Sequence, residues 1–277
     1  RMHIPALRVS DGPHGLRVQM EGADNLGMQE SKTAVCFPAI CALAASFDRS
    51  VLQSVGDAIG KECRAEGVDI ILGPGVNIKR SPLCGRNFEY YSEDPYVSSE
   101  LAAAYIDGVQ KNNVGACIKH FFANNQETRR FSVSAQMDER TAREIYLASF
   151  EGAVKKARPW SVMCAYNRIN GIYAAENKQY LTDLLRNEWD FEGFVVSDWG
   201  AVNDRVPDLE AGLDLEMPPL GDKNDRCIVN AVESGMLEEA VLDRAVGRLL
   251  NVVYRCGENR NDLSGFDHEK DHRIAKA

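Results

Sequence analysis

The chain has 277 residues, of which 44% are hydrophobic and 26% charged, and this suits one large α/β barrel or two modest globular domains. With 41 acidic and 32 basic residues its formal net charge is −9, which disfavours nucleic acid or an anionic membrane as a partner. No apolar run approaches the roughly 20 residues that a bilayer span needs, so we expect no membrane segment.

Short β-type runs alternate along the chain with longer stretches of helical periodicity, which is typical of a parallel sheet built from βαβ units. The predicted strands lie at 7–9, 69–72, 116–119, 161–164, 194–196 and, as a last short run, 213–217. The predicted helices lie at about 51–66, 95–110, 139–156 and 181–189, followed by two more, the second with an apolar face from Val241 to Val253. The fold class predicted is therefore α/β, a (β/α)8 TIM-type barrel that is incomplete or distorted at its N-terminus.

The composition turns polar after Gly257. We therefore predict a barrel domain at 1–257 and, at 258–277, a linker that includes 262–265 and the start of a further domain. His268 and His272 have a spacing that could bind a metal on a helix, but their charged surroundings favour a solvated helix start instead.

The first residue is Arg1, not Met, and no charged-then-apolar signal segment follows, so we expect an excised fragment of a cytoplasmic protein. The eight cysteines contain no Cys-x-x-Cys pair, and most lie in apolar runs. We expect buried, reduced thiols, with disulfides as the less favoured alternative. No metal and no other cofactor are predicted.

Reactive side chains follow several of the predicted strands. Asp11 follows the first, Lys119 and His120 end the third, and Tyr166 and Asp198 come after the next two. Taken singly, such an Asp is usually a turn or capping residue, and a Lys-His pair usually lies on the surface. Because the carboxyl ends of barrel strands meet at one face, their recurrence predicts a single cup.

Carboxylates, cations and aromatic rings in one cup suit a pyranose ring, which offers hydroxyls at its edge and apolar faces. A phosphate site would instead need a glycine-rich turn whose amides surround the anion. The Gly-Pro-Gly run at 73–75 is short, and its proline removes one amide, so we interpret it as a structural loop.

Five ordered blocks resemble glycoside hydrolase family 3, over nearly the whole chain from Arg8 to about Arg273. The blocks are Ser-Asp-Gly-Pro at 10–13, the run from Leu-Gly-Pro-Gly at 72–75 through Gly-Arg-Asn to Ser-Glu-Asp-Pro at 85–95, Lys-His-Phe-Phe-Ala-Asn-Asn-Gln-Glu at 119–127, Met-Cys-Ala-Tyr-Asn at 163–167 and Ser-Asp-Trp at 197–199. The resemblance implies a barrel domain followed by an α/β sandwich domain, with Asp198 as the nucleophile of a retaining β-glycosidase.

The resemblance also implies which residues bind the sugar. They are Asp11, for hydroxyls at the non-reducing end, with Arg17 close by; Arg86, Lys119, His120 and Arg130, for the remaining hydroxyls; and Tyr166, Met163 and Trp199, beside the nucleophile or as apolar wall. Arg17 and Arg130 have an alternative as surface charges, and Trp199 has one as a core residue. Nearby cations such as Arg86 and Lys119 are expected to keep Asp198 ionised near neutral pH.

Retention of configuration requires a second carboxyl group about 5–5.5 Å from the nucleophile, acting first as acid and then as base. In family members of this type it is a glutamate of the sandwich domain, which would lie beyond Ala277. Glu89, Glu127 and Glu216 are candidates inside the chain, but we expect them to hold loops. The histidine-aspartate arrangement of the N-acetylhexosaminidases accompanies Lys-His-Phe-Pro-Gly-His-Gly, which this sequence lacks.

The function predicted is that of an exo-acting β-glucosidase that releases terminal β-D-glucosyl residues. A β-xylosidase or a broader exo-glycosidase is the nearest alternative, and a non-catalytic sugar-binding fragment is an alternative of another class. The expected partners are a β-glucoside or oligosaccharide and the C-terminal domain of the same protein. Without that domain we expect the chain to be inactive or weakly active.

Overall fold

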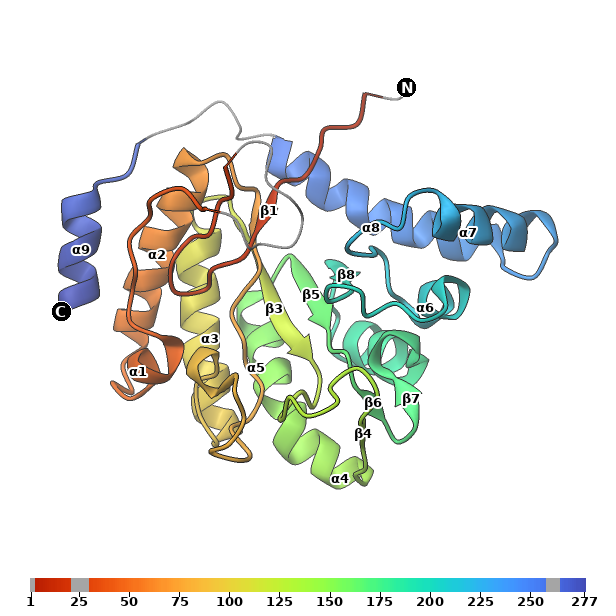
Figure 1. The fold of residues 1–277 in the computed structure, drawn as a ribbon, viewed down its shortest axis with the longest axis horizontal. Coiled ribbons are helices and arrows are strands. Elements are labelled where there is room, and N and C mark those ends of the chain that lie inside the picture. Colours follow the sequence, from red (N-terminus) through yellow and green to blue (C-terminus); the bar gives the residue numbers. More distant parts are fainter. Residues whose placement is uncertain (1–2, 21–29, 258–264) are drawn as a thin grey trace.

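The computed structural model describes residues 3–20, 30–257 and 265–277. Its centre is a five-stranded sheet, parallel throughout, in the order β1-β2-β3-β5-β8. The strands are β1 (Val9–Ser10), β2 (Ile70–Ile71), β3 (Gly115–Phe121), β5 (Ser161–Cys164) and β8 (Phe194–Val196). A parallel bridge from Val196 to Leu215 extends the sheet past β8. The curled sheet and its helices form an incomplete TIM-type barrel, as predicted (Figure 1).

Three helices lie side by side along one flank of the sheet, α2 (Arg49–Ala65), α3 (Pro95–Gln110) and α5 (Ala148–Ala157) (Figure 1). The other α-helices are α1 (Ile40–Ala44), α4 (Glu139–Thr141), α6 (Arg205–Ala211), α7 (Lys223–Glu233), α8 (Glu239–Gly257) and α9 (His268–Lys276). Short 3₁₀ turns are η1 (Asn87–Glu89) and η3 (Ala174–Glu176), and π-helical segments are η2 (Ala142–Tyr146) and η4 (Gln179–Glu188). A small second sheet contains β4 (Ser134–Ala135), β6 (Arg168–Ile169) and β7 (Ile172–Tyr173).

The predicted helix at 95–110 and the predicted strands at 161–164 and 194–196 agree with the structure, whereas the first strand lies at 9–10 instead of 7–9. The single helix predicted at 139–156 is wrong, because η2 interrupts it. The amide of Leu147 donates to the carbonyl of Ala142, five residues back, at 2.8 Å. That wider turn brings the fully buried side chains of Ala142 and Leu147 to the same face of the segment. In a regular α-helix, two side chains five residues apart would point about 140° away from each other.

Helices α2 and α3 touch through their backbones at two glycines. A Cβ added to Gly56 would lie 2.3 Å from the carbonyl oxygen of Tyr105, and one added to Gly108 would lie 2.3 Å from the carbonyl oxygen of Gln53. Neither contact involves a flexible side chain that could move aside. The two glycines therefore set how closely the two helices pack.

We expect Gly56→Ala to lower the free energy of unfolding by about 1–3 kcal/mol, because the added methyl group must push two packed helices apart. Gly247, inside α8, is the matched control, since a Cβ there meets no atom within 4 Å. Gly247→Ala should raise the free energy of unfolding by up to about 1 kcal/mol. Urea unfolding of both variants tests this, and a Gly56→Ala protein as stable as the parent would contradict the close contact.

The C-terminal segment at 265–277 forms α9, which packs against α2 through Ile274 and Ala275. His268 and His272 are exposed, as predicted for a solvated helix start, and Asp267 caps the helix by accepting from the amide of Lys270. The described ranges contain no cluster of three or more side chains that could hold a metal ion. Most of the predicted linker at 262–265 lies outside the described residues, and the domain boundary stays a prediction.

All eight cysteines lie within the described ranges, and all are free thiols. Five are buried, which agrees with their positions in apolar runs, while Cys36 and Cys227 are exposed and Cys41 is half-buried. None of the helices that the structure describes is long and apolar enough to cross a membrane.

Candidate active site

A cavity of about 710 Å³ opens at the carboxyl ends of the strands. All ten residues singled out in the sequence line it: Asp11, Arg17, Arg86, Lys119, His120, Arg130, Met163, Tyr166, Asp198 and Trp199. They come from distant parts of the chain, since Asp11 and Asp198, 187 positions apart, meet in one cavity. The parallel sheet brings Asp11, Lys119, His120, Tyr166 and Asp198 together at the carboxyl ends of its strands, and the loops that follow the strands carry Arg17, Arg86 and Arg130 to the same cavity.

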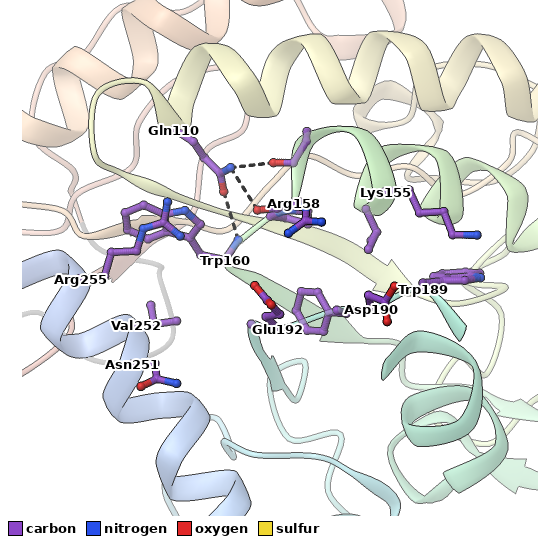
Figure 2. A pocket seen from close by; sticks show the side chains of 15 residues that line it. Gln110, Lys155, Arg158, Trp160, Trp189, Asp190, Glu192, Asn251, Val252 and Arg255 are labelled. Carbon is purple, nitrogen blue, oxygen red and sulfur yellow. Dashed lines mark hydrogen bonds between the residues drawn. The ribbon is translucent and has the colours of Figure 1, made fainter. Parts of the chain in front are cut away.

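A second cavity, of about 770 Å³, lies at the amino ends of β5 and β8 (Figure 2). Its polar groups hold the chain that leads into β5. The side-chain amide of Gln110 donates to the carbonyls of Ala157 and Arg158, and its oxygen accepts from the amide of Trp160. The guanidinium of Arg255 covers the Trp160 ring at 4.1 Å. Because barrel chemistry belongs to the carboxyl ends of strands, we assign the site to the first cavity.

Only one of the two oxygens of the Asp198 carboxylate accepts hydrogen bonds from the described residues. Its Oδ1 accepts from the hydroxyl of Tyr166 at 2.9 Å and from the amide of Trp199 at 2.7 Å. Its Oδ2 is buried and accepts no hydrogen bond from any described residue. Burial raises the pKa of Asp198, while the Trp199 amide and the Lys119 and Arg86 cations oppose that rise. These groups offset only part of the desolvation, and the net shift of the Asp198 pKa is upward.

His120 faces the free oxygen of Asp198, with its Nε2 3.6 Å from Oδ2. On the opposite side of the ring, Nδ1 lies 3.2 Å from the hydroxyl of Tyr90. Burial lowers the pKa of His120 well below its ordinary value, and the neighbouring Arg86, Lys119 and Arg130 lower it further. The imidazole is therefore neutral at physiological pH.

Lys119 and Asp11 form an ion pair across the sheet, with 2.8 Å between Nζ and Oδ1. The lysine side chain is buried, whereas the Asp11 side chain is 51% exposed toward the cavity. Burial acts to lower the pKa of Lys119, but the carboxylates of Asp11 and Glu89 outweigh it and the net shift is upward. The pKa of Asp11 is lowered, because attraction to Lys119 overcomes its partial desolvation. Both groups are charged at neutral pH.

The three glutamates weighed as internal acids all face a cation or an amide. Glu89 pairs with Arg86, which lies at the cavity wall. Glu127 accepts from Arg130 at 2.9 Å. Glu216 accepts from the side-chain amide of Asn224 at 2.7 Å. These contacts fit the expectation that the glutamates hold loops.

Arg130 and Phe131 both pack on the ring of Tyr166 at the rim of the cavity. The guanidinium of Arg130 lies over the ring of Tyr166 at 4.5 Å, and Phe131 packs on the same ring with centroids 4.5 Å apart. Arg130 is thus an ordered part of the cavity wall, and the surface-charge alternative does not apply to it. Phe131 is 53% exposed and was missed in the sequence. Its position directly after Arg130, which the resemblance places at the sugar, could have indicated that Phe131 lies at the cavity.

Trp199 is 39% exposed at the cavity, which rules out the core-residue alternative. Met163, by contrast, is a buried residue of β5 that also lines the cavity. Arg17 is exposed, and its amide donates to the carbonyl of Asp11 at 3.0 Å. Cavity-lining residues that the sequence did not indicate are Arg8, Val9, Ser10, Val18, Gln19, Met20, Leu72, Phe131 and Met217.

The Gly-Pro-Gly loop at 73–75 is packed tightly from both sides. A Cβ on Gly73 would lie 2.6 Å from Cβ of Pro13, and one on Gly75 would lie 2.9 Å from the carbonyl oxygen of Glu89. The glycines are needed for this close approach, which agrees with the structural interpretation of the loop.

Known proteins match the chain over nearly its whole length. It is 59% identical over 276 residues to thermostable beta-glucosidase B of Acetivibrio thermocellus, covering 100% of this chain and 37% of that protein. It is 49% identical over 251 residues to an exo-alpha-(1->6)-L-arabinopyranosidase of Bifidobacterium longum, covering 90% of this chain and 33% of that protein. The chain therefore spans about a third of the length of these relatives.

Solved structures show the same fold. The GH3 beta-glucosidase of Bifidobacterium adolescentis superposes with a TM-score of 0.91 at 46% identity. Beta-glucosidase 3B from Thermotoga neapolitana in complex with glucose does so with a TM-score of 0.90 at 45% identity. Each match covers 98% of this chain and 39% of the solved one. A model of the glycosyl hydrolase family 3 N-terminal domain matches residues 6–252, and the chain therefore belongs to glycosyl hydrolase family 3.

Proposed function

We propose that this chain forms the nucleophile-bearing part of a retaining, exo-acting β-glucosidase, with Asp198 as the nucleophile. The observation that carries the proposal is the asymmetry of the Asp198 carboxylate. One oxygen is fixed by Tyr166 and the Trp199 amide, and the other is buried at the cavity wall without a hydrogen-bond donor. An oxygen held in this way is available to attack an anomeric carbon, and the nearby cations favour its charged form.

The acid that protonates the leaving group is proposed to come from a part of the longer protein beyond Ala277. In support, the internal candidates Glu89 and Glu127 are engaged with arginines, and Glu216 accepts from an amide. The relatives are also about three times as long as this chain. In the proposed mechanism the glutamate first gives its proton to the departing aglycone and then takes one from the water that releases the sugar.

Covalent labelling tests the proposal directly. A 2-fluoro-glucoside with a good leaving group should accumulate a glycosyl-enzyme on the longer protein, and peptide mass spectrometry should locate the sugar on Asp198. The isolated chain, treated in the same way, tests whether this part is competent alone. A label on another residue would remove Asp198 from its proposed role, and binding of glucose without any label would favour a non-catalytic sugar-binding protein.

The glycone is proposed to be β-D-glucose, since several similar proteins are named beta-glucosidases. A second candidate is an α-L-arabinopyranoside, because a relative that is 49% identical is named for that activity. β-Xylosides remain the third. Relative kcat/KM values on nitrophenyl β-D-glucoside, β-D-xyloside and α-L-arabinopyranoside rank the three directly.

We further propose that Asp11, which is exposed toward the cavity and ionised by its Lys119 partner, binds hydroxyls at the non-reducing end of the sugar. Asp11→Ala should then lower kcat/KM on the β-D-glucoside by about 10- to 100-fold, the loss expected for a hydrogen bond to a charged group. The loss should be smaller on the β-D-xyloside, which lacks the C6 hydroxyl. Equal losses on both substrates would mean that Asp11 does not bind that hydroxyl.

A reducing compartment such as the cytoplasm is proposed as the location, and the eight free thiols support it. Alkylation of the protein isolated from its native cells without reductant should modify the exposed Cys36 and Cys227. Their protection until reductant is added would argue for an oxidising compartment.

A further inference from the structure

A chain of hydrogen bonds runs from the partly exposed rim of the cavity to the buried imidazole of His120. Arg130 donates to Glu127 at 2.9 Å, and the side-chain amide of Asn124 lies 3.4 Å from the other oxygen of that carboxylate. The same amide lies 3.1 Å from the hydroxyl of Tyr90, which is 3.2 Å from Nδ1 of His120. None of these contacts touches Asp198.

The direction of the bonds is fixed at the Asn124 end. A carboxylate paired with an arginine has only acceptors to offer, so the Asn124 atom that faces Glu127 must be the NH₂ group. That same NH₂ group therefore donates to the oxygen of Tyr90. The one hydrogen of the Tyr90 hydroxyl is left for another acceptor.

That acceptor is Nδ1 of His120. If Nδ1 carried the proton, the Tyr90 oxygen would receive two hydrogen bonds and its own hydrogen would have no acceptor among the described residues, although Tyr90 is 0% exposed. An unmade hydrogen bond of this kind costs about 1–3 kcal/mol. Burial also raises the pKa of Tyr90, so its hydroxyl keeps the hydrogen that it donates.

The opposite side of the ring leads to the same assignment. Nε2 faces Oδ2 of Asp198 at 3.6 Å, and that oxygen accepts no hydrogen bond from any described residue. An unprotonated Nε2 would place one hydrogen-bond acceptor beside another, the carboxylate oxygen Oδ2. A protonated Nε2 instead directs a donor toward that carboxylate. The main chain of His120 is meanwhile clamped by Asn77, which accepts from its amide at 2.8 Å and donates to its carbonyl at 2.9 Å.

We infer that Tyr90, itself oriented by Asn124, is a positioning residue that holds neutral His120 in the Nε2–H tautomer, so that His120 offers the cavity one hydrogen-bond donor and no acceptor. At 3.6 Å the Nε2–H is not committed to Asp198, so it is free to donate to a substrate hydroxyl. That hydroxyl can in turn donate to Oδ2 of the carboxylate. The consequence for catalysis rests on the proposed function, but the tautomer does not.

Nitrogen-15 NMR of the 277-residue chain tests the tautomer. Long-range correlations between ring protons and ring nitrogens distinguish a protonated Nε2 from a protonated Nδ1, and His120→Gln identifies the His120 signals by their loss. We expect the Nε2–H pattern in the parent protein, unchanged between pH 5 and 8 because the pKa of buried His120 is well below its ordinary value. Tyr90→Phe should replace it with a mixture that contains the Nδ1–H form.

Tyr91→Phe is the matched control, because Tyr91 is the next residue and is also buried, and its hydroxyl has no hydrogen-bond partner among the described residues. It should leave the His120 signals unchanged. An Nδ1–H or doubly protonated His120 in the parent protein would overturn the inference even if Tyr90→Phe failed to fold. Unchanged His120 signals in a folded Tyr90→Phe protein would overturn it as well.

Kinetics of the longer protein separate this inference from the proposed function. Tyr90→Phe should lower kcat/KM on an aryl β-glucoside by roughly three- to tenfold, the range expected for one uncharged hydrogen bond, and Tyr91→Phe should not. If the parent protein cleaves no glycoside but shows the Nε2–H pattern, the proposed function fails and the tautomer assignment stands. If it cleaves the glucoside and His120 carries its proton on Nδ1, the tautomer assignment fails and the proposed function stands.

Discussion

Replacing Asp198 with alanine should lower hydrolysis of an aryl β-glucoside by the longer protein by about 10⁴-fold or more. The substitution removes the atom that is proposed to form the bond to the anomeric carbon, and losses of this order are typical when a nucleophile or its immediate partner is deleted. Folding should be little affected, because Oδ2 has no donor to lose and Oδ1 leaves behind only the Tyr166 hydroxyl and one amide.

Rescue with azide distinguishes a nucleophile from a residue that merely shapes the cavity. In Asp198→Ala the small anion can enter the space left by the carboxylate and attack the anomeric carbon once. The product should be a glucosyl azide of inverted, α configuration, identified by its proton NMR coupling. Glu192→Gln, an exposed carboxyl at the second cavity on the opposite end of the sheet, is the control and should keep full activity. Turnover retained in Asp198→Ala would exclude the assignment.

Five of the ten cavity residues could be singled out from their positions after predicted strands, because a parallel sheet imposes a simple geometry, and the other five came from the resemblance to the family. A polar residue that directly follows a β-type run lies at the carboxyl end of its strand, and these ends share one face. This rule alone predicts that Asp11, Lys119 and Asp198 lie together, and all three line the same cavity. Their roles in the reaction stay predictions until the substitutions are made.

What the sequence could not indicate depends on distances between residues far apart in the chain. Tyr90 and Asn124 stand in recognisable blocks, yet their relation to His120 rests on contacts across 30 and 34 residues. The π-helical turn at Leu147 was equally hidden, because it follows from where the core lies. The polar segment at 268–276 gave no sign of packing on α2, since only Ile274 and Ala275 make the apolar contact.

Asp208 is the clearest case of a residue whose environment contradicts its sequence context. It lies between two other charged residues of the short helix α6, Arg205 and Glu210, yet it is 0% exposed and neither carboxyl oxygen has a hydrogen-bond partner within the described ranges. Burial raises the pKa of Asp208 to about 8, with Glu176 adding to the rise and Arg205 opposing it. The folded protein therefore keeps this carboxyl protonated at neutral pH, where an unfolded chain ionises it.

We expect Asp208→Asn to stabilise the protein increasingly as pH rises. Below about pH 4 both states hold the proton and the carboxyl has no pH-linked effect. Between about pH 4 and pH 8 only the folded state holds it, so the parent loses on the order of 1.4 kcal/mol of stability per pH unit, and above pH 8 the loss stops growing. Asparagine has nearly the same shape and no charge to lose, so the variant should escape this loss.

Urea unfolding at pH 5, 7 and 9 measures the effect. The gap in free energy of unfolding between Asp208→Asn and the parent should widen by about 3 kcal/mol from pH 5 to pH 7, and further by pH 9. Glu210→Gln removes one negative charge from an exposed position on the same helix, so its gap should stay small and constant. An equally constant gap for Asp208→Asn would contradict the prediction. It would mean that the carboxyl ionises in the folded state with its ordinary pKa, which requires water or a cation to reach the buried side chain.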